Sequence, residues 1–161
     1  MTEAESKKTV VEVVREQLSD PFLLKTIWDG RNVDPLLQSI INTSNRTGNN
    51  HAFTFTVGGN LVSGILISAN EYYDQLAIEF SSQFETENGS AESVKSKILE
   101  LKQNPTDIDE NAPAVQFVHL REAEVFTSNG LPIAPGGVLW RGKISSIDGW
   151  NVGRLLTSSN G

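Results

Sequence analysis

The feature that most constrains the fold is an alternating stretch interrupted by two glycines. In residues 53–57 the sequence Phe-Thr-Phe-Thr-Val alternates apolar and polar side chains, the pattern of a strand with one buried face. Gly58 and Gly59 follow, and glycine readily adopts the positive φ angles of a tight hairpin turn. Residues 61–67 form the expected return strand. The sequence therefore predicts an antiparallel β-hairpin.

Helical spacing follows this hairpin directly. Apolar side chains recur three or four residues apart from Tyr72 to Phe84, and Asn70 is a suitable N-cap, which predicts an amphipathic helix over about 71–84. A second helix is expected to begin at Ser90. The acidic, proline-containing residues 104–113 indicate an exposed linker.

The last third of the chain is again typical of β-structure. Residues 115–120 and 123–126 indicate one strand, or one strand with a bulge. Residues 138–147 indicate a long strand, the Asp148-Gly149 pair indicates a hairpin turn, and residues 150–155 are the expected return strand. This pairing would place Trp140 and Trp150 on neighbouring strands.

The first residues have a helical character of their own. Valines in residues 7–18 allow one helical face, and two Asp-Pro pairs, Asp20-Pro21 and Asp34-Pro35, each combine an N-cap with a first-turn proline. The polar run 42–50 indicates a linker. We therefore expect an N-terminal helical segment and linker at 1–48, a core domain at 49–157 and a disordered tail at 158–161.

Together these elements predict an α+β fold. Hairpin connections favour a mostly antiparallel sheet of about five strands, packed on one or two helices and preceded by the N-terminal helical segment. Such a sheet could also curl into a small open barrel.

Composition excludes several functions. The chain has no cysteine and two histidines, His51 and His119, and neither histidine accompanies a nucleophile motif. Its glycine pairs lack the lysine and spacing of phosphate-binding loops. We therefore predict no enzyme, cofactor or metal site. The net charge of −7 makes nucleic acid an unlikely partner. Without a membrane span or a signal-peptide core, the expected location is the cytoplasm.

Two short blocks stand out against this acidic background. Tryptophans and cations gather around the expected last hairpin, and tryptophan and arginine are enriched at binding hot spots. They form a candidate protein-interaction site: Trp140, Arg141, Lys143, Trp150 and Arg154. The alternative interpretation is that both tryptophans belong to the core and the cations only flank them.

Three segments together carry a family resemblance: residues 62–76 (VSGILISANEYYDQL), 117–123 (FVHLREA) and 139–150 (LWRGKISSIDGW). Over about residues 53–155 the chain resembles the gas vesicle accessory protein U (GvpU) family. The resemblance implies a cytoplasmic accessory protein outside the gas-filled shell, associated with vesicle assembly and in part with clustering. It also implies gas vesicle proteins, or further copies of the chain, as partners. It carries over no catalytic residues.

Two other functions are alternatives. Gly64, Leu66, Asn70 and Asp74 imitate the first motif of Sm-like RNA-binding rings, and Arg141-Gly142 imitates the second. However, that motif needs a strand where residues 70–84 have helical periodicity, and the net charge opposes RNA binding. The other alternative is an acidic holdase-type chaperone that offers apolar grooves to unfolded chains.

Overall fold

The computed structural model describes residues 9, 19–21, 33–84, 89–102, 114–127, 130, 132–133 and 135–155. Internal contacts divide the chain into two units, residues 1–33 and 34–161, and every element below belongs to the second unit. The helices expected over residues 7–18 and from Asp20-Pro21 to Gly30, the linker at 104–113 and the tail at 158–161 fall almost entirely outside the described residues.

The second unit is built on one five-stranded sheet in which every pair of neighbours is antiparallel. Its strands are β1 (His51–Val57), β2 (Asn60–Ile67), β3 (Phe117–Phe126), β4 (Val138–Lys143) and β5 (Gly149–Val152), in the order β4-β3-β2-β1-β5. The predicted hairpin at Gly58-Gly59 is confirmed as β1–β2. The α+β class with an open antiparallel sheet is also confirmed.

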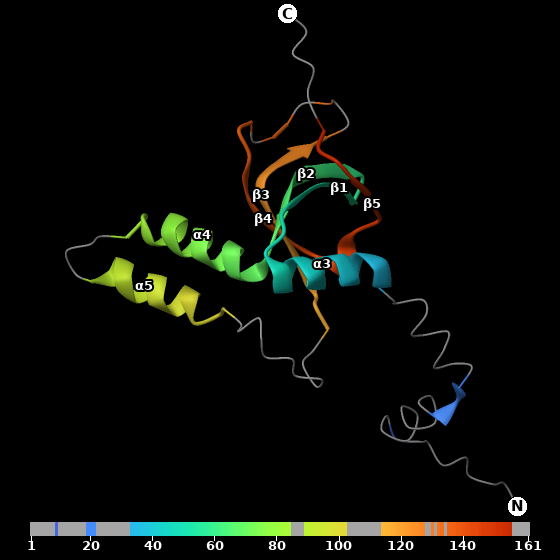
Figure 1. Ribbon diagram of the computed structural model, residues 1–161, viewed down its shortest axis with the longest axis horizontal. Helices are drawn as coiled ribbons and strands as arrows, with labels where there is room; N and C mark the ends of the chain where they lie inside the picture. Colours follow the sequence, from blue (N-terminus) through green and yellow to red (C-terminus); the bar gives the residue numbers. More distant parts are fainter. Residues whose placement is uncertain are drawn as a thin grey trace, which may run out of the picture. The chain divides into compact units, whose positions relative to one another are not determined.

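The sheet is curled, as the connection between its two edges requires. Four strand spacings would separate β4 from β5 by about 19 Å in a flat sheet. Only residues 144–148 connect them, and Ile144–Ser146 form a 3₁₀ turn with a short rise per residue. This connection spans only about 16 Å. β4 and β5 also run in the same direction, so the connection leads from the end of β4, opposite Phe117, to the start of β5, opposite Thr56. The sheet must therefore coil, and Figure 1 shows the strands curving accordingly.

The predicted last hairpin is wrong. The strand expected over 138–147 ends at Lys143, because the buried Ile144 starts the 3₁₀ turn and donates its amide to Gln116 O at 2.9 Å. Asp148 does not form a hairpin turn. Its Oδ2 accepts from the Gly58 amide at 2.8 Å, which fixes the start of β5 beside the β1–β2 turn. Trp140 and Trp150 consequently lie on opposite edges of the sheet.

The bulge considered for the third strand is present in β3. Its register shifts against both β2 and β4, and Glu122 has a φ of 51°. A glycine lies opposite the bulge on each of the two neighbouring segments, Gly64 on β2 and Gly137 just before β4. A Cβ on Gly64 would be 3.0 Å from the Ala123 Cα, and a Cβ on Gly137 would be 2.6 Å from the Glu122 carbonyl carbon. The bulge fits because both neighbouring positions lack a side chain.

Replacing Gly137 with alanine tests this close approach. Gly136 is the matched control, since both glycines have positive φ but nothing lies within 4 Å of a Cβ at Gly136. Gly136→Ala should cost about 1–2 kcal/mol of unfolding free energy through backbone strain alone. Gly137→Ala should cost about 1–3 kcal/mol more because of overpacking. Chemical denaturation measures both values, and equal losses would contradict a tight contact at the bulge.

Among the described residues, three α-helices accompany the sheet: α3 (Pro35–Thr47), α4 (Ala69–Ser81) and α5 (Ser90–Leu99). Asp34 caps α3 as predicted, with its Oδ1 accepting from the Leu36 amide at 2.8 Å. Ser68, and not Asn70, caps α4. In Figure 1, α3 runs along one end of the sheet, while α4 and α5 form a hairpin that extends away from it.

The polar run 42–50 is not wholly a linker. α3 continues through it to Thr47 and ends at Gly48, which has a φ of 68°. Thr43 and Thr47 donate their hydroxyls to backbone carbonyls one turn earlier, and Ser44 is buried. Leu37 and Ile41 are each only 1% exposed, so α3 contributes directly to the core of the second unit.

The domain boundary expected at 48/49 stays a prediction that two truncations can test. A chain beginning at residue 34 should retain cooperative thermal melting. A chain beginning at residue 49 should lose at least about 3 kcal/mol of unfolding free energy, because the two fully buried side chains of α3 are removed. Equal stability of the two chains would instead support the boundary at 48/49.

Candidate interaction surface

The five residues of the predicted interaction site do not form one cluster. Trp140, Arg141 and Lys143 lie on β4, whereas Trp150 lies on β5 and Arg154 follows it. Since β4 and β5 occupy opposite edges of the sheet, the two groups have different surroundings.

Trp150 connects the sheet to α3. The indole is half-buried against Phe53, with 5.8 Å between the ring centroids, and its Nε1 donates to Asp34 Oδ2 at 2.7 Å. This hydrogen bond, together with the amides of Leu36 and Leu37, holds the pKa of the Asp34 carboxyl below its ordinary value. Trp150 therefore anchors the start of α3, a role that sequence reasoning did not find.

Arg154 is occupied by internal contacts. The chain after β5 crosses the sheet, where the Leu155 amide donates to Ser63 Oγ at 2.8 Å. The Arg154 guanidinium then reaches the β3 bulge, donating to Glu122 Oε2 and to the Glu122 carbonyl, both at 3.0 Å. Its charge is therefore balanced inside the protein.

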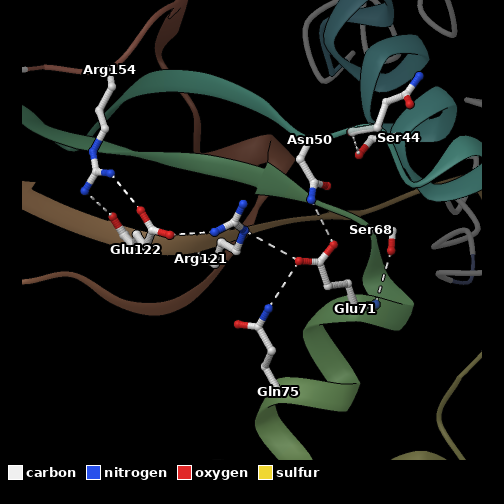
Figure 2. A network of polar contacts seen from close by, with 9 residues as sticks. Ser44, Asn50, Ser68, Glu71, Gln75, Arg121, Glu122 and Arg154 are labelled. Atoms are coloured by element: carbon white, nitrogen blue, oxygen red, sulfur yellow. Dashed lines mark hydrogen bonds and ion pairs between the residues drawn. The ribbon is translucent and has the colours of Figure 1, made fainter.

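The Arg154–Glu122 pair belongs to the polar network drawn in Figure 2. Arg121 binds Glu122 on one side and approaches Glu71 Oε1 of α4 at 3.6 Å on the other. Glu71 also accepts from Gln75 and Asn50, at 3.2 Å each. The network joins four segments, but its members are partly exposed, so each pair contributes little stability alone.

Arg141 and Lys143 differ from Arg154. Both are exposed, and in the part of the chain that the structure describes neither has a hydrogen bond or an ion pair. Arg141 lies over the Phe117 ring, 4.0 Å from its centroid, and 5.9 Å from that of Tyr73. Such cation–π contacts fix the guanidinium plane without neutralising its charge.

Trp140 projects to the other face of β4, because neighbouring strand residues alternate. Its half-buried ring covers Gly142, where an added Cβ would be 2.1 Å from the Trp140 Cη2 atom. The glycine of the Trp-Arg-Gly-Lys block thus provides the space that the indole occupies.

His119 is enclosed beneath Arg141. The imidazole is 3% exposed, its centroid is 4.5 Å from that of the Tyr72 ring, and neither ring nitrogen has a hydrogen-bond partner among the described residues. Burial chiefly, and the Arg141 charge in addition, lower the pKa of His119 to about 4. This environment is typical of a histidine that is packed in the core.

Protonation of His119 should destabilise the protein in mildly acidic solution. The unfolded chain takes up this proton near pH 6.5, whereas the folded state takes it up only near pH 4. Stability is therefore complete above pH 6.5 and falls until about pH 4, by about 3 kcal/mol. His119→Leu should remove this part of the pH dependence. Denaturation of both proteins at pH 7 and pH 4 gives the difference, and parallel pH profiles would contradict the assignment.

The helical hairpin carries a second candidate surface. Its large apolar side chains Ile78, Phe80, Phe84 and Leu101 are 64%, 44%, 38% and 55% exposed. Sequence periodicity placed Phe80 and Phe84 on the apolar face of one long helix, but α4 ends at Ser81 and extends beyond the sheet. The C-terminal part of a face that sequence spacing predicts as buried is therefore open here, while Tyr72 and Ala77 on the same face are buried.

A cavity of about 370 Å³ lies between α3 and the β1–β5 edge. It is mainly apolar and is lined by Ser39, Ile40, Thr43, Ser44, Asn49, His51, Phe53 and Val152.

Within the described residues, no three metal-ligating side chains lie close enough to hold an ion. None of the described helices has the length and hydropathy to cross a membrane.

Comparison with known families identifies the family of the chain. A family model described as "Gas vesicle protein GvpU-like" matches residues 34–155, most of the chain. The chain therefore belongs to the GvpU-like family of gas vesicle proteins. The match begins at the N-cap of α3, earlier than the resemblance seen in the sequence. No curated protein and no solved structure matches the chain. The Sm-like alternative would require a strand at Asn70, where the structure has α4.

Proposed function

We propose that this protein is a gas vesicle accessory protein of the cytoplasm. It lies outside the gas-filled shell and acts in vesicle assembly or clustering through contacts with gas vesicle proteins or with further copies of itself. Family membership over residues 34–155 is the observation that carries this proposal.

The proposed interface is the predicted set Trp140, Arg141, Lys143, Trp150 and Arg154. Its contacting part is β4, where the two cations are exposed and have no carboxylate partner among the described residues. Arg154 supports β4 indirectly, because it binds the β3 bulge beside that strand, whereas Trp150 on the opposite edge anchors α3.

A holdase-type chaperone is the second candidate. The exposed apolar side chains of the helical hairpin favour it, because large open apolar surfaces mark sites of protein association. The two functions predict different sensitive residues. A holdase should lose activity when Ile78 and Phe80 become polar, whereas the accessory function should depend on β4.

Flotation tests the proposed function. Purified protein mixed with intact gas vesicles should rise with the buoyant layer, and pressure collapse of the vesicles should abolish this. Arg141→Glu with Lys143→Glu should reduce the floating fraction while the melting temperature hardly changes, since exposed interface charges affect association more than folding.

The matched control is Arg46→Glu with Lys97→Glu. This pair also exchanges one exposed arginine and one exposed lysine, on α3 and α5, and changes the net charge equally. It should float like the wild type. Wild-type protein that stays below intact vesicles would refute the proposed function.

A further inference from the structure

We infer that the segment recognised by β4 is an extended acidic strand of a partner protein, with carboxylates at alternating positions, that adds to the free edge of the sheet. This inference rests on the proposed function and specifies the chemistry of the partner.

The edge of β4 provides backbone hydrogen-bonding groups that a partner strand can bind. β4 is last in the sheet order, and within the described residues only β3 pairs with it. Alternate residues of an edge strand direct N–H and C=O groups away from the sheet, where another strand can bind them. Six residues, Val138–Lys143, present this edge.

The charged side chains of β4 provide a second contribution to recognition of the partner strand. Arg141 and Lys143 are two residues apart on one strand, so they share a face at a spacing of about 7 Å. Of the other described cations, Lys102 binds Asp74, and both Arg121 and Arg154 bind Glu122. The remaining three lie on helices and not on a strand edge: Arg46, Lys95 and Lys97. In a protein of net charge −7, two adjacent unpaired cations at a strand edge are complementary to carboxylates repeated at the same spacing.

The arginine is already oriented for such a ligand. Stacking on Phe117 occupies one face of the guanidinium and leaves its N–H donors at the rim. A planar fork of donors held in this way matches a carboxylate bidentately. Little side-chain freedom remains to be lost on binding.

The other face of β4 defines the residues between the carboxylates. Val138 is 44% exposed and Trp140 is half-buried on that face, so the intervening partner side chains should be apolar. The other open edge of the sheet, β5, has the sequence Gly-Trp-Asn-Val and no acid. A second copy offering β5 would therefore leave Arg141 and Lys143 unpaired, which favours an acidic partner.

A short synthetic peptide of alternating aspartate and valine is the probe, with a lysine–valine peptide as its control. Titration into the full chain should show saturable binding of the aspartate peptide only. Amide NMR shifts should be concentrated at β4. Arg141→Glu with Lys143→Glu should weaken binding by about tenfold or more, the size expected for one charged hydrogen bond or more. The Arg46→Glu, Lys97→Glu control should leave affinity within about threefold, because only screened long-range attraction is lost.

Two further probes keep the result decisive. If the double glutamate variant has a lowered melting temperature, Arg141→Gln with Lys143→Gln removes the positive charges without reversing them and should still weaken binding. A peptide N-methylated at alternate amides should fail to bind if backbone pairing contributes. Equal affinity of the methylated peptide, equal weakening by the control pair, or peptide-induced shifts away from β4 would each overturn the inference.

Failure of the acidic-strand inference and failure of the proposed function give different experimental results. Wild-type protein that floats with vesicles but ignores the aspartate peptide overturns the acidic-strand inference alone. Peptide binding together with loss of flotation in the β4 variant supports it. A concentration-dependent dimer that forms through β4 without the peptide would show that a second copy occupies the edge, and would also overturn it.

Discussion

The bulge in β3 at Glu122 is the constraint on which the rest of this structure depends. A bulge bends its strand and increases the local twist, and here Gly64 and Gly137 leave space for it on both sides. The resulting curl brings the two edges of the sheet close enough for residues 144–148 to connect them. The bulge also exposes the Glu122 carbonyl and carboxylate to Arg154, so the same irregularity fastens the chain that crosses the sheet.

Local signals in the sequence predicted most of the elements but not their arrangement. The alternation before Gly58 and the Asp34-Pro35 pair each act within a few residues, so the hairpin and the start of α3 could be read directly. Asp148-Gly149 has the same local appearance as a hairpin turn. Its carboxylate, however, binds the amide of Gly58, 90 residues earlier in the chain, and no local pattern reports such a partner.

The candidate site shows the same limit. Residue types identified a block rich in tryptophan and cations, but they could not tell which cations were already neutralised. Arg154 meets Glu122 only because the chain crosses the sheet after β5, and Trp150 meets Asp34 only because α3 lies beside that edge. Arg141 and Lys143 remain available for the opposite reason, because no acidic side chain on β3 or α4 reaches them among the described residues.

The absence of any buried side chain on α5 has a consequence for how the molecule moves. Its packing is against α4, and the Lys102–Asp74 pair at its end is largely exposed. Opening of this helix therefore costs far less than opening of the sheet, and its amides should exchange with solvent through local fluctuations that leave the strands closed. α5 is thus the more easily opened element of the second unit, whereas the free edge of β4 belongs to the more stable sheet.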